Sequence, residues 1–352
     1  MRIIYHALVT VILMHTPALA QNTASKPFIQ IKQTQKLGLP LDCELNKTCW
    51  VMNYVDFDTA DDATKDPACL NRTYDTHKGT DFAILDEKAI IDGVPVIATK
   101  DGIVRRFRDG ENDNWKTNAD LDLIKQERKE CGNAILIDHN DDTTSIYCHL
   151  RQNSITVTKG QRIKKGDSIG LVGMSGFTEF PHLHYGLIED GKIIDPFTGA
   201  STEKECGLNN AKPLWEGDLN LTYKPFVIQA AEFSTTIPTL DSIGRNATGT
   251  TQISLQDDNL VFWTVLLGVR TDDIIEMDIF DVNNKLLVEE KIIQKKNRAR
   301  QLYYIGKKIN GTNVQEGAYT AKVKITRPND NEDNREATPL NTFEIRTILV
   351  TP

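Results

Sequence analysis

The sequence lacks an excess of basic residues, and this absence limits its possible partners. Its 352 residues include 41 Lys and Arg against 49 Asp and Glu, which gives a formal net charge of -8. Proteins that bind nucleic acid normally present a basic face to the phosphates, so we expect no nucleic-acid partner. The same balance disfavours a protein that is held on an anionic membrane surface by charge.

Long apolar runs are also scarce. The one conspicuous run, residues 3–14, follows Arg2 and is too short to cross a bilayer comfortably. It precedes the small-x-small pattern of residues 18–20, which is typical of a signal-peptidase site. We therefore expect a signal peptide at residues 1–20, a periplasmic or secreted protein, and no stable membrane span after cleavage. An uncleaved anchor is the alternative.

The six cysteines include no CxxC pair, which disfavours a thiolate metal site. An even number of cysteines in an exported chain favours disulfides instead. The connectivity cannot be deduced from sequence, because six cysteines allow 15 pairings. One hypothesis is that the first pair closes a short loop, a second pair lies across a hairpin, and the remaining two join: Cys43–Cys49, Cys131–Cys148 and Cys69–Cys206.

Strand patterns dominate the chain and predict an all-β protein. Residues 75–200 contain short apolar stretches separated by glycines, and no long helix is indicated. This pattern predicts a small antiparallel β-sheet or barrel-sandwich, with a hairpin around the turn at 139–142. Regular strands and turns return in residues 226–352 and predict an immunoglobulin-like β-sandwich. That second region has no histidine and no cysteine, so it offers little scope for metal or thiol chemistry.

Other segments lack a regular pattern. Residues 21–40 are polar and predict a flexible arm, and residues 41–70 predict a loop-rich stretch. Residues 108–130 are charged and predict an irregular insertion that could rim a groove. Trp115 within it could stack on a ligand, although a packing contact is the commoner use of such a residue. We predict that His139, at the hairpin turn, is an exposed loop residue.

Four of the seven histidines lie in compact, turn-flanked motifs: His77, His149, His182 and His184. The last two occupy alternate positions of a strand pattern, so their imidazoles should lie on one face. Imidazole is the commonest zinc ligand and the commonest general acid or base in proteins. Chance and core histidines also produce such a pair, so the other motifs are needed to support a site.

His77 and Asp81 flank Gly79, which permits a sharp backbone turn and lets both side chains converge. A hairpin turn with an incidental histidine is the alternative. Together with His182 or His184 they make the His₂Asp set of a catalytic zinc site, which keeps a fourth position for water and makes that water more acidic. His149 and the other member of the pair would then move protons or steady an oxyanion. Amide hydrolysis needs these parts, and the absence of HExxH excludes a thermolysin-like arrangement.

These motifs resemble those of the lysostaphin/LytM-type zinc metallopeptidases over roughly residues 40–200. The segment from His77 to Asp81 resembles the family's HxGxD motif. The segments at residues 147–150 and 181–184 resemble its YxHL-like and HxH motifs, in the family's order. The resemblance implies a small antiparallel β-fold with an open groove and cleavage of stem or cross-link peptides of bacterial peptidoglycan. It implies that the Zn²⁺ ligands are His77, Asp81 and His184. It also implies that the catalytic pair is His149 and His182.

The expected organisation is an arm at 21–40, a zinc metallopeptidase domain at 41–203, a connector at 204–225 and a sandwich at 226–352. A protein partner could bind through the last of these. Because some members of the family have lost ligands, a non-hydrolytic cell-wall-binding or hydrolase-activator protein is the alternative function. Residues 164–170 resemble the hairpin of lipoyl carrier domains, but the histidine set and the expected export disfavour a carrier.

Overall fold

The computed structural model describes residues 35–58, 60–245, 249–309, 314–328 and 340–351. The predicted signal peptide and most of the predicted arm lie outside these residues. Within them, no helix combines the length and apolar character that a membrane crossing requires. Residues 35–40, at the end of the predicted arm, are packed: Leu37 is 1% exposed and its N–H donates to the backbone oxygen of Leu214 at 2.9 Å.

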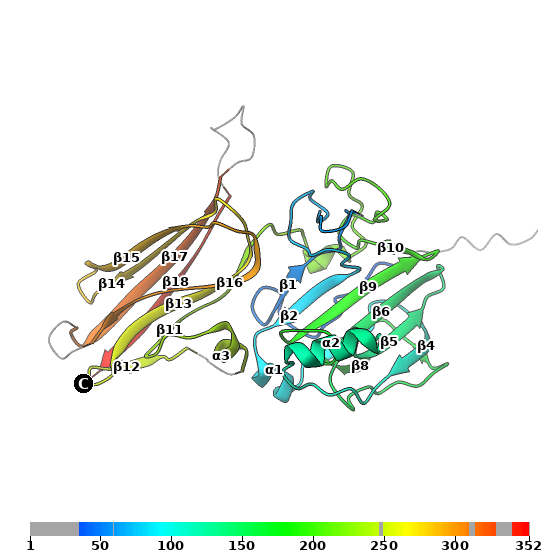
Figure 1. The fold of residues 1–352 in the computed structure, drawn as a ribbon, viewed down its shortest axis with the longest axis horizontal. Coiled ribbons are helices and arrows are strands. Elements are labelled where there is room, and N and C mark those ends of the chain that lie inside the picture. The colour runs from blue at the N-terminus through cyan, green and yellow to red at the C-terminus, as the bar shows by residue number, and fades with distance from the viewer. Residues whose placement is uncertain (1–34, 59, 246–248, 310–313, 329–339, 352) are drawn as a thin grey trace, which may run out of the picture. The chain divides into compact units, whose positions relative to one another are not determined.

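An antiparallel sheet of eight strands forms the first half of the fold (Figure 1). The strands run in the order β1-β2-β9-β6-β5-β4-β7, and β10 pairs with β9. Their bounds are β1 Cys49–Asn53, β2 Thr80–Ile84, β4 Gly102–Arg108, β5 Asn133–Asp138, β6 Thr143–Leu150, β7 Arg162–Ile163, β9 His182–Glu189 and β10 Lys192–Ile194. A separate two-stranded sheet joins β3 Pro95–Ile97 to β8 Ser168–Leu171.

The hairpin predicted around residues 139–142 is present, and a second hairpin lies near the end of this half. Strands β5 and β6 pair around residues 139–142, and β9 pairs with β10 across Asp190 and Gly191. Asp190 and Gly191 have φ of 50° and 77°, the left-handed conformation that a two-residue hairpin turn requires. Apolar side chains from one face of β2, β9, β6 and β5 fill the core, including Phe82, Leu183 and Tyr147.

Two expectations about irregular segments are corrected. Strand β1 lies inside the stretch predicted to be loop-rich, where its five residues are all buried and pair with β2. The predicted irregular insertion contains helix α2, Asn118–Gln126. This helix forms because Thr117 and Asp120 make a reciprocal capping box at its start. A second short helix, α1, spans Glu87–Asp92.

The three disulfides have the connectivity of the hypothesis above, which is confirmed: Cys43–Cys49, Cys69–Cys206 and Cys131–Cys148. All six cysteines of the chain are therefore paired. The bond with the longest span joins positions 137 residues apart. It ties the segment before β2 to the segment after β10, and crosslinks of long spans restrict the unfolded chain most.

The C-terminal half contains a three-stranded sheet, β11-β13-β16, and a five-stranded sheet, β12-β18-β17-β14-β15. Their apolar side chains form one shared core, which confirms the predicted all-β class. The strands are β11 Val227–Ser234, β12 Gln252–Ser254, β13 Asn259–Val269, β14 Ile274–Phe280, β15 Leu286–Ile293, β16 Arg298–Lys308, β17 Gly317–Arg327 and β18 Leu340–Thr351. Helix α3, Leu240–Arg245, follows β11, and a 3-10 turn spans Gly217–Leu219.

Candidate metal centre and catalytic pair

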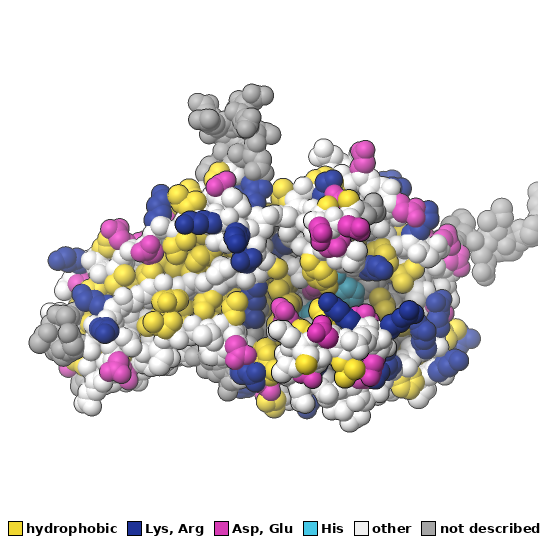
Figure 2. Space-filling view, viewed as in Figure 1, with side chains coloured by type: hydrophobic (Ala, Val, Ile, Leu, Met, Phe, Trp, Pro, Cys, Tyr) yellow, Lys and Arg dark blue, Asp and Glu magenta, His cyan; other side chains and the backbone are white. Residues whose placement is uncertain are grey.

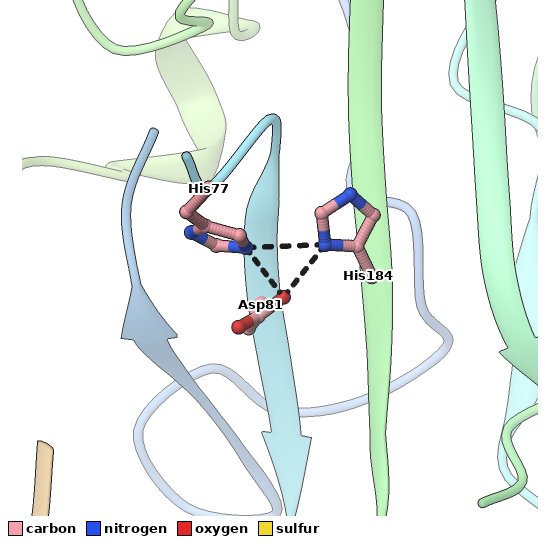
Figure 3. A group of neighbouring side chains, drawn as sticks. All are labelled: His77, Asp81 and His184. Carbon is pink, nitrogen blue, oxygen red and sulfur yellow. Dashed lines mark hydrogen bonds and ion pairs between the residues drawn. The ribbon is translucent and has the colours of Figure 1, made fainter. Parts of the chain in front are cut away.

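The structure brings together the three side chains that the sequence suggested as metal ligands. His77 Nε2 lies 3.0 Å from Asp81 Oδ1, His184 Nδ1 lies 2.9 Å from the same oxygen, and the two nitrogens are 3.1 Å apart (Figure 3). His77 and Asp81 are 2% and 1% exposed, whereas the His184 side chain is 14% exposed. The cluster is therefore open to solvent on one side, and histidine side chains are visible in a hollow of the surface (Figure 2).

Strand pairing and one glycine place these ligands. Asp81 on β2 lies directly opposite His184 on β9, and His77 lies in the turn before β2. A Cβ at Gly79 would stand 2.6 Å from His184 Nε2 and 2.6 Å from the backbone oxygen of Tyr185. Only glycine therefore lets the turn pass so close to the His184 ring.

Neighbouring groups fix which atoms face the centre of the cluster. His77 Nδ1 lies 2.6 Å from the backbone oxygen of Tyr54, which can only accept, so Nδ1 carries the proton and Nε2 presents a lone pair. Asn53 Nδ2 donates to Asp81 Oδ2 at 2.9 Å, which leaves Oδ1 for the imidazoles. Burial raises the pKa of Asp81, but His77, His182 and His184 outweigh it and hold that pKa well below its usual value.

This donor set fits a small divalent metal such as zinc. Two imidazole nitrogens and one carboxylate oxygen converge on one point, each within 4.8 Å of the others. Ligand atoms of a tetrahedral zinc site stand roughly 3.3 Å apart when the bonds are about 2.0 Å long. The observed separations of 2.9, 3.0 and 3.1 Å are only slightly shorter. Three protein ligands leave one position for water or substrate, the arrangement of catalytic zinc sites.

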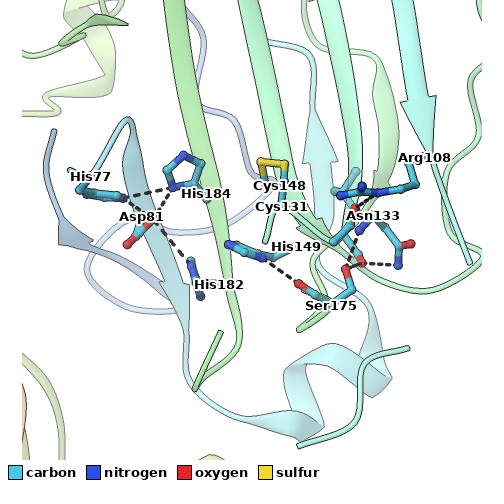
Figure 4. The surroundings of a disulfide bond; sticks show 12 residues. His77, Asp81, Arg108, Cys131, Asn133, Cys148, His149, Ser175, His182 and His184 are labelled. Carbon is cyan, nitrogen blue, oxygen red and sulfur yellow. Dashed lines mark hydrogen bonds and ion pairs between the residues drawn. A yellow bond between two sulfur atoms is a disulfide. The ribbon is translucent and has the colours of Figure 1, made fainter. Parts of the chain in front are cut away.

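Two further imidazoles lie beside the ligand cluster. The rings of His149 and His182 have centroids 4.6 Å apart (Figure 4). His182 Nδ1 donates to the backbone oxygen of Phe180 at 2.9 Å, and His149 Nδ1 donates to that of Ser175 at 2.7 Å. Each ring therefore keeps Nε2 as an acceptor, and that of His182 lies 3.7 Å from Asp81 Oδ1.

Burial keeps both of these imidazoles neutral. It is the main cause that lowers the pKa of His149 well below its usual value, and the adjacent His182 and His184 act in the same direction. Burial also lowers the pKa of His182, although the nearby Asp81 opposes the shift. Near neutral pH both rings are uncharged bases that can take up a proton, as a general base requires.

The strand alternation of the sequence predicts that Tyr147 and His149 share one face of β6, and this prediction is wrong. Tyr147 points into the core, whereas His149 lies beside His182. His149 has a φ of 62°, and the pairing of β5 with β6 shifts register opposite it, between Asn133 and Ile135. This bulge breaks the alternation and turns the imidazole toward the site.

Several contacts hold His149 in its left-handed conformation. Its N–H donates to the backbone oxygen of Cys131 at 2.9 Å, and its own oxygen accepts from Gly173 at 3.0 Å. The Cys131–Cys148 disulfide joins the two segments at this point (Figure 4). The Ser175 hydroxyl accepts from the backbone N–H of Asn133 at 2.9 Å, so the carbonyl that orients the imidazole is itself held in place.

His139, which we predicted to be an exposed turn residue, is buried. It is 7% exposed, its Nδ1 lies 2.8 Å from the backbone oxygen of Asp101, and its Nε2 lies 2.8 Å from the Ser145 hydroxyl. A β-turn can bury its side chains when the loop folds back on a neighbouring strand, and here the loop meets the turn before β4. His139 therefore braces the hairpin, apart from the metal cluster.

Other residues of the site carried no recognisable sequence signal. Asn53, Tyr54 and Ser175 contribute an amide or a backbone carbonyl to the site, and no motif marks such contributions. Tyr74 stacks on the His77 ring with centroids 4.2 Å apart and is 50% exposed. The sequence signal for Tyr74 was limited to its position three residues before His77. Trp115 packs with its ring 4.6 Å from the Arg245 guanidinium, which is a packing contact.

A β-sheet that carries a His₂Asp cluster and two neutral imidazoles has the features expected of a metallopeptidase catalytic domain. Comparison with known proteins agrees with this class: residues 75–196 match peptidase family M23. This match confirms the resemblance that the three motifs indicated, within the range of residues expected for it.

The similar proteins are much longer than the segment that matches this chain. The chain is 32% identical over 119 residues to the peptidoglycan DD-endopeptidase ShyA of Vibrio cholerae, covering 34% of this chain and 22% of that protein. It is 28% identical over 136 residues to an uncharacterized metalloprotease of Haemophilus influenzae, covering 39% and 23%. The matched segment thus spans less than a quarter of each relative. A solved zinc-containing peptidase of Vibrio cholerae shares 28% identity over 41% of this chain and 39% of that chain, with a TM-score of 0.26.

Proposed function

We propose that this protein is an exported zinc endopeptidase that hydrolyses peptide bonds in the stem or cross-link peptides of bacterial peptidoglycan. The observation that carries the proposal is the convergence of three ligand atoms, from His77, Asp81 and His184, next to two imidazoles whose Nε2 atoms are free to accept. A purely structural cluster would have no need of two buried, neutral bases beside it.

Two further observations support the substrate and the compartment. Relatives of the matched segment bear the name peptidoglycan DD-endopeptidase, which favours a cell-wall peptide as substrate. Three disulfides within the described residues favour an oxidising compartment, because cytosolic thiols are kept reduced. The second observation supports a periplasmic or secreted location, which agrees with the leader pattern of the sequence.

The residues of the site can perform the steps of amide hydrolysis. Zinc held by the three ligands would supply a Lewis acid that polarises a carbonyl group and makes water more acidic. The Nε2 of His149 or His182 accepts the proton of the attacking water. The same group, once protonated, donates to the developing oxyanion or to the leaving amine. The carbonyls of Ser175 and Phe180 hold both rings in the tautomer that these transfers need.

The proposal is tested by digesting purified peptidoglycan with the purified protein and analysing the released muropeptides by mass spectrometry. Chelator-treated protein is compared before and after zinc is restored, and the masses of the products identify the bond that is cut. Products that require zinc are the expected result. A protein that binds one zinc per chain yet releases nothing would contradict the proposal and favour a non-hydrolytic wall-binding or activator protein.

A further inference from the structure

A cleft of about 470 Å³ lies beside the candidate metal centre and is walled by both halves of the described chain. Trp115 and Phe180 line it from the first half, and Leu240 of α3 and Arg300 of β16 line it from the second. Its floor includes Met52, which packs in an apolar cluster with Leu267 of β13. The C-terminal half therefore supplies part of a surface next to the site.

The backbone connects this cleft closely to the catalytic groups. The Phe180 ring stacks on the His182 imidazole with centroids 4.4 Å apart, and the Phe180 carbonyl accepts a hydrogen bond from His182 Nδ1. Met52 immediately precedes Asn53, whose amide holds Asp81. A peptide bound at the metal centre would therefore meet the cleft within a few residues of the bond to be cut.

Arg300 is the unusual group in this cleft. Its Nε donates to Gln229 Oε1 at 3.1 Å, but its Nη2 atom is buried and finds no hydrogen-bond partner among the residues that the structure describes. Burial lowers the pKa of Arg300 to about 10, which still leaves the guanidinium charged at neutral pH. A buried cationic N–H without an acceptor is unfavourable, and a bound anion would relieve it.

The acidic side chains of the cleft do not serve as that anion. Asp241 lines the cleft, but both of its carboxylate oxygens accept from Arg245 Nε at 3.0 Å. Glu179 and Arg300 both line the cleft, yet the ion pairs of the described residues include none between them. The guanidinium therefore has no carboxylate partner among the described residues, and its planar fork suits one.

We propose that Arg300 binds a free carboxylate of the peptide substrate, so that the C-terminal half helps to select the substrate. The inference rests on the proposed function, because it places the carboxylate on the peptide whose bond the metal centre cuts. The apolar walls of Trp115, Phe180 and Leu240 would contact small apolar side chains between that carboxylate and the scissile bond. Arg300 is therefore a specificity-determining residue that lies away from the reacting atoms.

The test compares two forms of one soluble cross-linked muropeptide, with its carboxylates free or converted to methylamides. We expect amidation to lower kcat/KM of the wild-type protein about tenfold or more, mainly through KM, since one charged hydrogen bond and one ion contact are lost. Arg300→Gln should have a low kcat/KM on both forms, and amidation should hardly change it. Arg300→Lys should regain part of the preference for the form with free carboxylates. Arg298→Gln is the matched control, because it removes the same charge from an exposed position of the same strand.

A binding measurement separates this inference from the proposed function. The affinity of both muropeptide forms is measured by calorimetry on His149→Ala, with and without Arg300→Gln, so that no turnover is needed. Carboxylate-dependent binding that disappears with Arg300→Gln supports the inference even if the wild-type protein releases nothing from peptidoglycan. An unchanged preference in Arg300→Gln, equal losses on both forms, or no binding of either form would overturn it.

Discussion

Gly79→Ala tests the geometry of the metal centre with the smallest possible change, a single methyl group. That methyl would stand 2.6 Å from His184 Nε2, 2.7 Å from His184 Cε1 and 2.6 Å from the backbone oxygen of Tyr185. This oxygen belongs to Tyr185 of β9, which is paired with β2, so it cannot easily move. The His184 ring must therefore shift, and its Nδ1 leaves the position near Asp81 that zinc binding requires.

The expected size of the effect follows from two separate costs. Overpacking by one methyl group in a tight site costs about 1–3 kcal/mol of stability. Displacement of a ligand by a fraction of an ångström should weaken zinc binding about tenfold to hundredfold, as the loss of a supporting contact does. Zinc affinity is measured by competition with a chromogenic chelator, and the stability of the metal-free protein is measured by thermal unfolding.

Gly217→Ala is the matched control for this change. A Cβ at Gly217 would meet nothing within 4 Å, and its backbone, like that of Gly79, is not in the left-handed region. Both substitutions therefore reduce the freedom of the unfolded chain equally, and only Gly79→Ala adds the clash. Wild-type zinc affinity in Gly79→Ala would refute the close approach of the turn to His184, and with it the account of how the ligands are placed.

Three further predictions concern single side chains. His184→Ala should abolish zinc binding while the fold survives, because one ligand of three is lost; zinc retained at wild-type affinity, measured by the same competition, would reject the ligand set. His149→Ala should retain zinc but lose turnover of peptidoglycan, because its base lies outside the ligand set; unchanged turnover would show that His149 is structural. Burial raises the pKa of Asp195 to about 6, so between about pH 4 and pH 6 the folded state holds a proton that the unfolded state has released, and stability falls as pH rises through this window. Asp195→Asn should remove up to about 3 kcal/mol of that pH dependence, and urea unfolding at several pH values that shows the same slope in both proteins would contradict the assignment.

The convergence of the candidate ligands could be predicted from sequence because their placement depends on local rules. Residues two apart in a strand share a face, which describes His182 and His184. A glycine between His77 and Asp81 allows the turn that brings them together. Each rule acts over a few residues, so a short motif contains nearly all the information that the geometry needs. The disulfide hypothesis succeeded for a similar reason, since two of the pairs are close in sequence or flank one hairpin.

The orientation of His149 could not be predicted, because it depends on partners far along the chain. The alternation of β6 would point it into the core, and a bulge opposite Asn133 reverses it. The contacts that stabilise the bulge come from Cys131 on one side and from Gly173 and Ser175 on the other. A rule based on the strand alone therefore selects a residue that lies beside His182 but gives the wrong face of the strand.

Arg300 shows the same limit in the C-terminal half. Arg298 and Arg300 are identical in type and two positions apart on β16, so sequence pattern treats them alike. Packing separates them: Arg298 is exposed, whereas Arg300 lines a cleft that reaches Phe180 and has a buried Nη2 atom with no partner in the described part of the chain. The absence of histidine and cysteine from this half predicted little metal or thiol chemistry there, but it carried no information about anion binding. A candidate anion site of this kind arises where folding buries a cationic group without giving it an acceptor. Only the three-dimensional structure shows which cation is in that position.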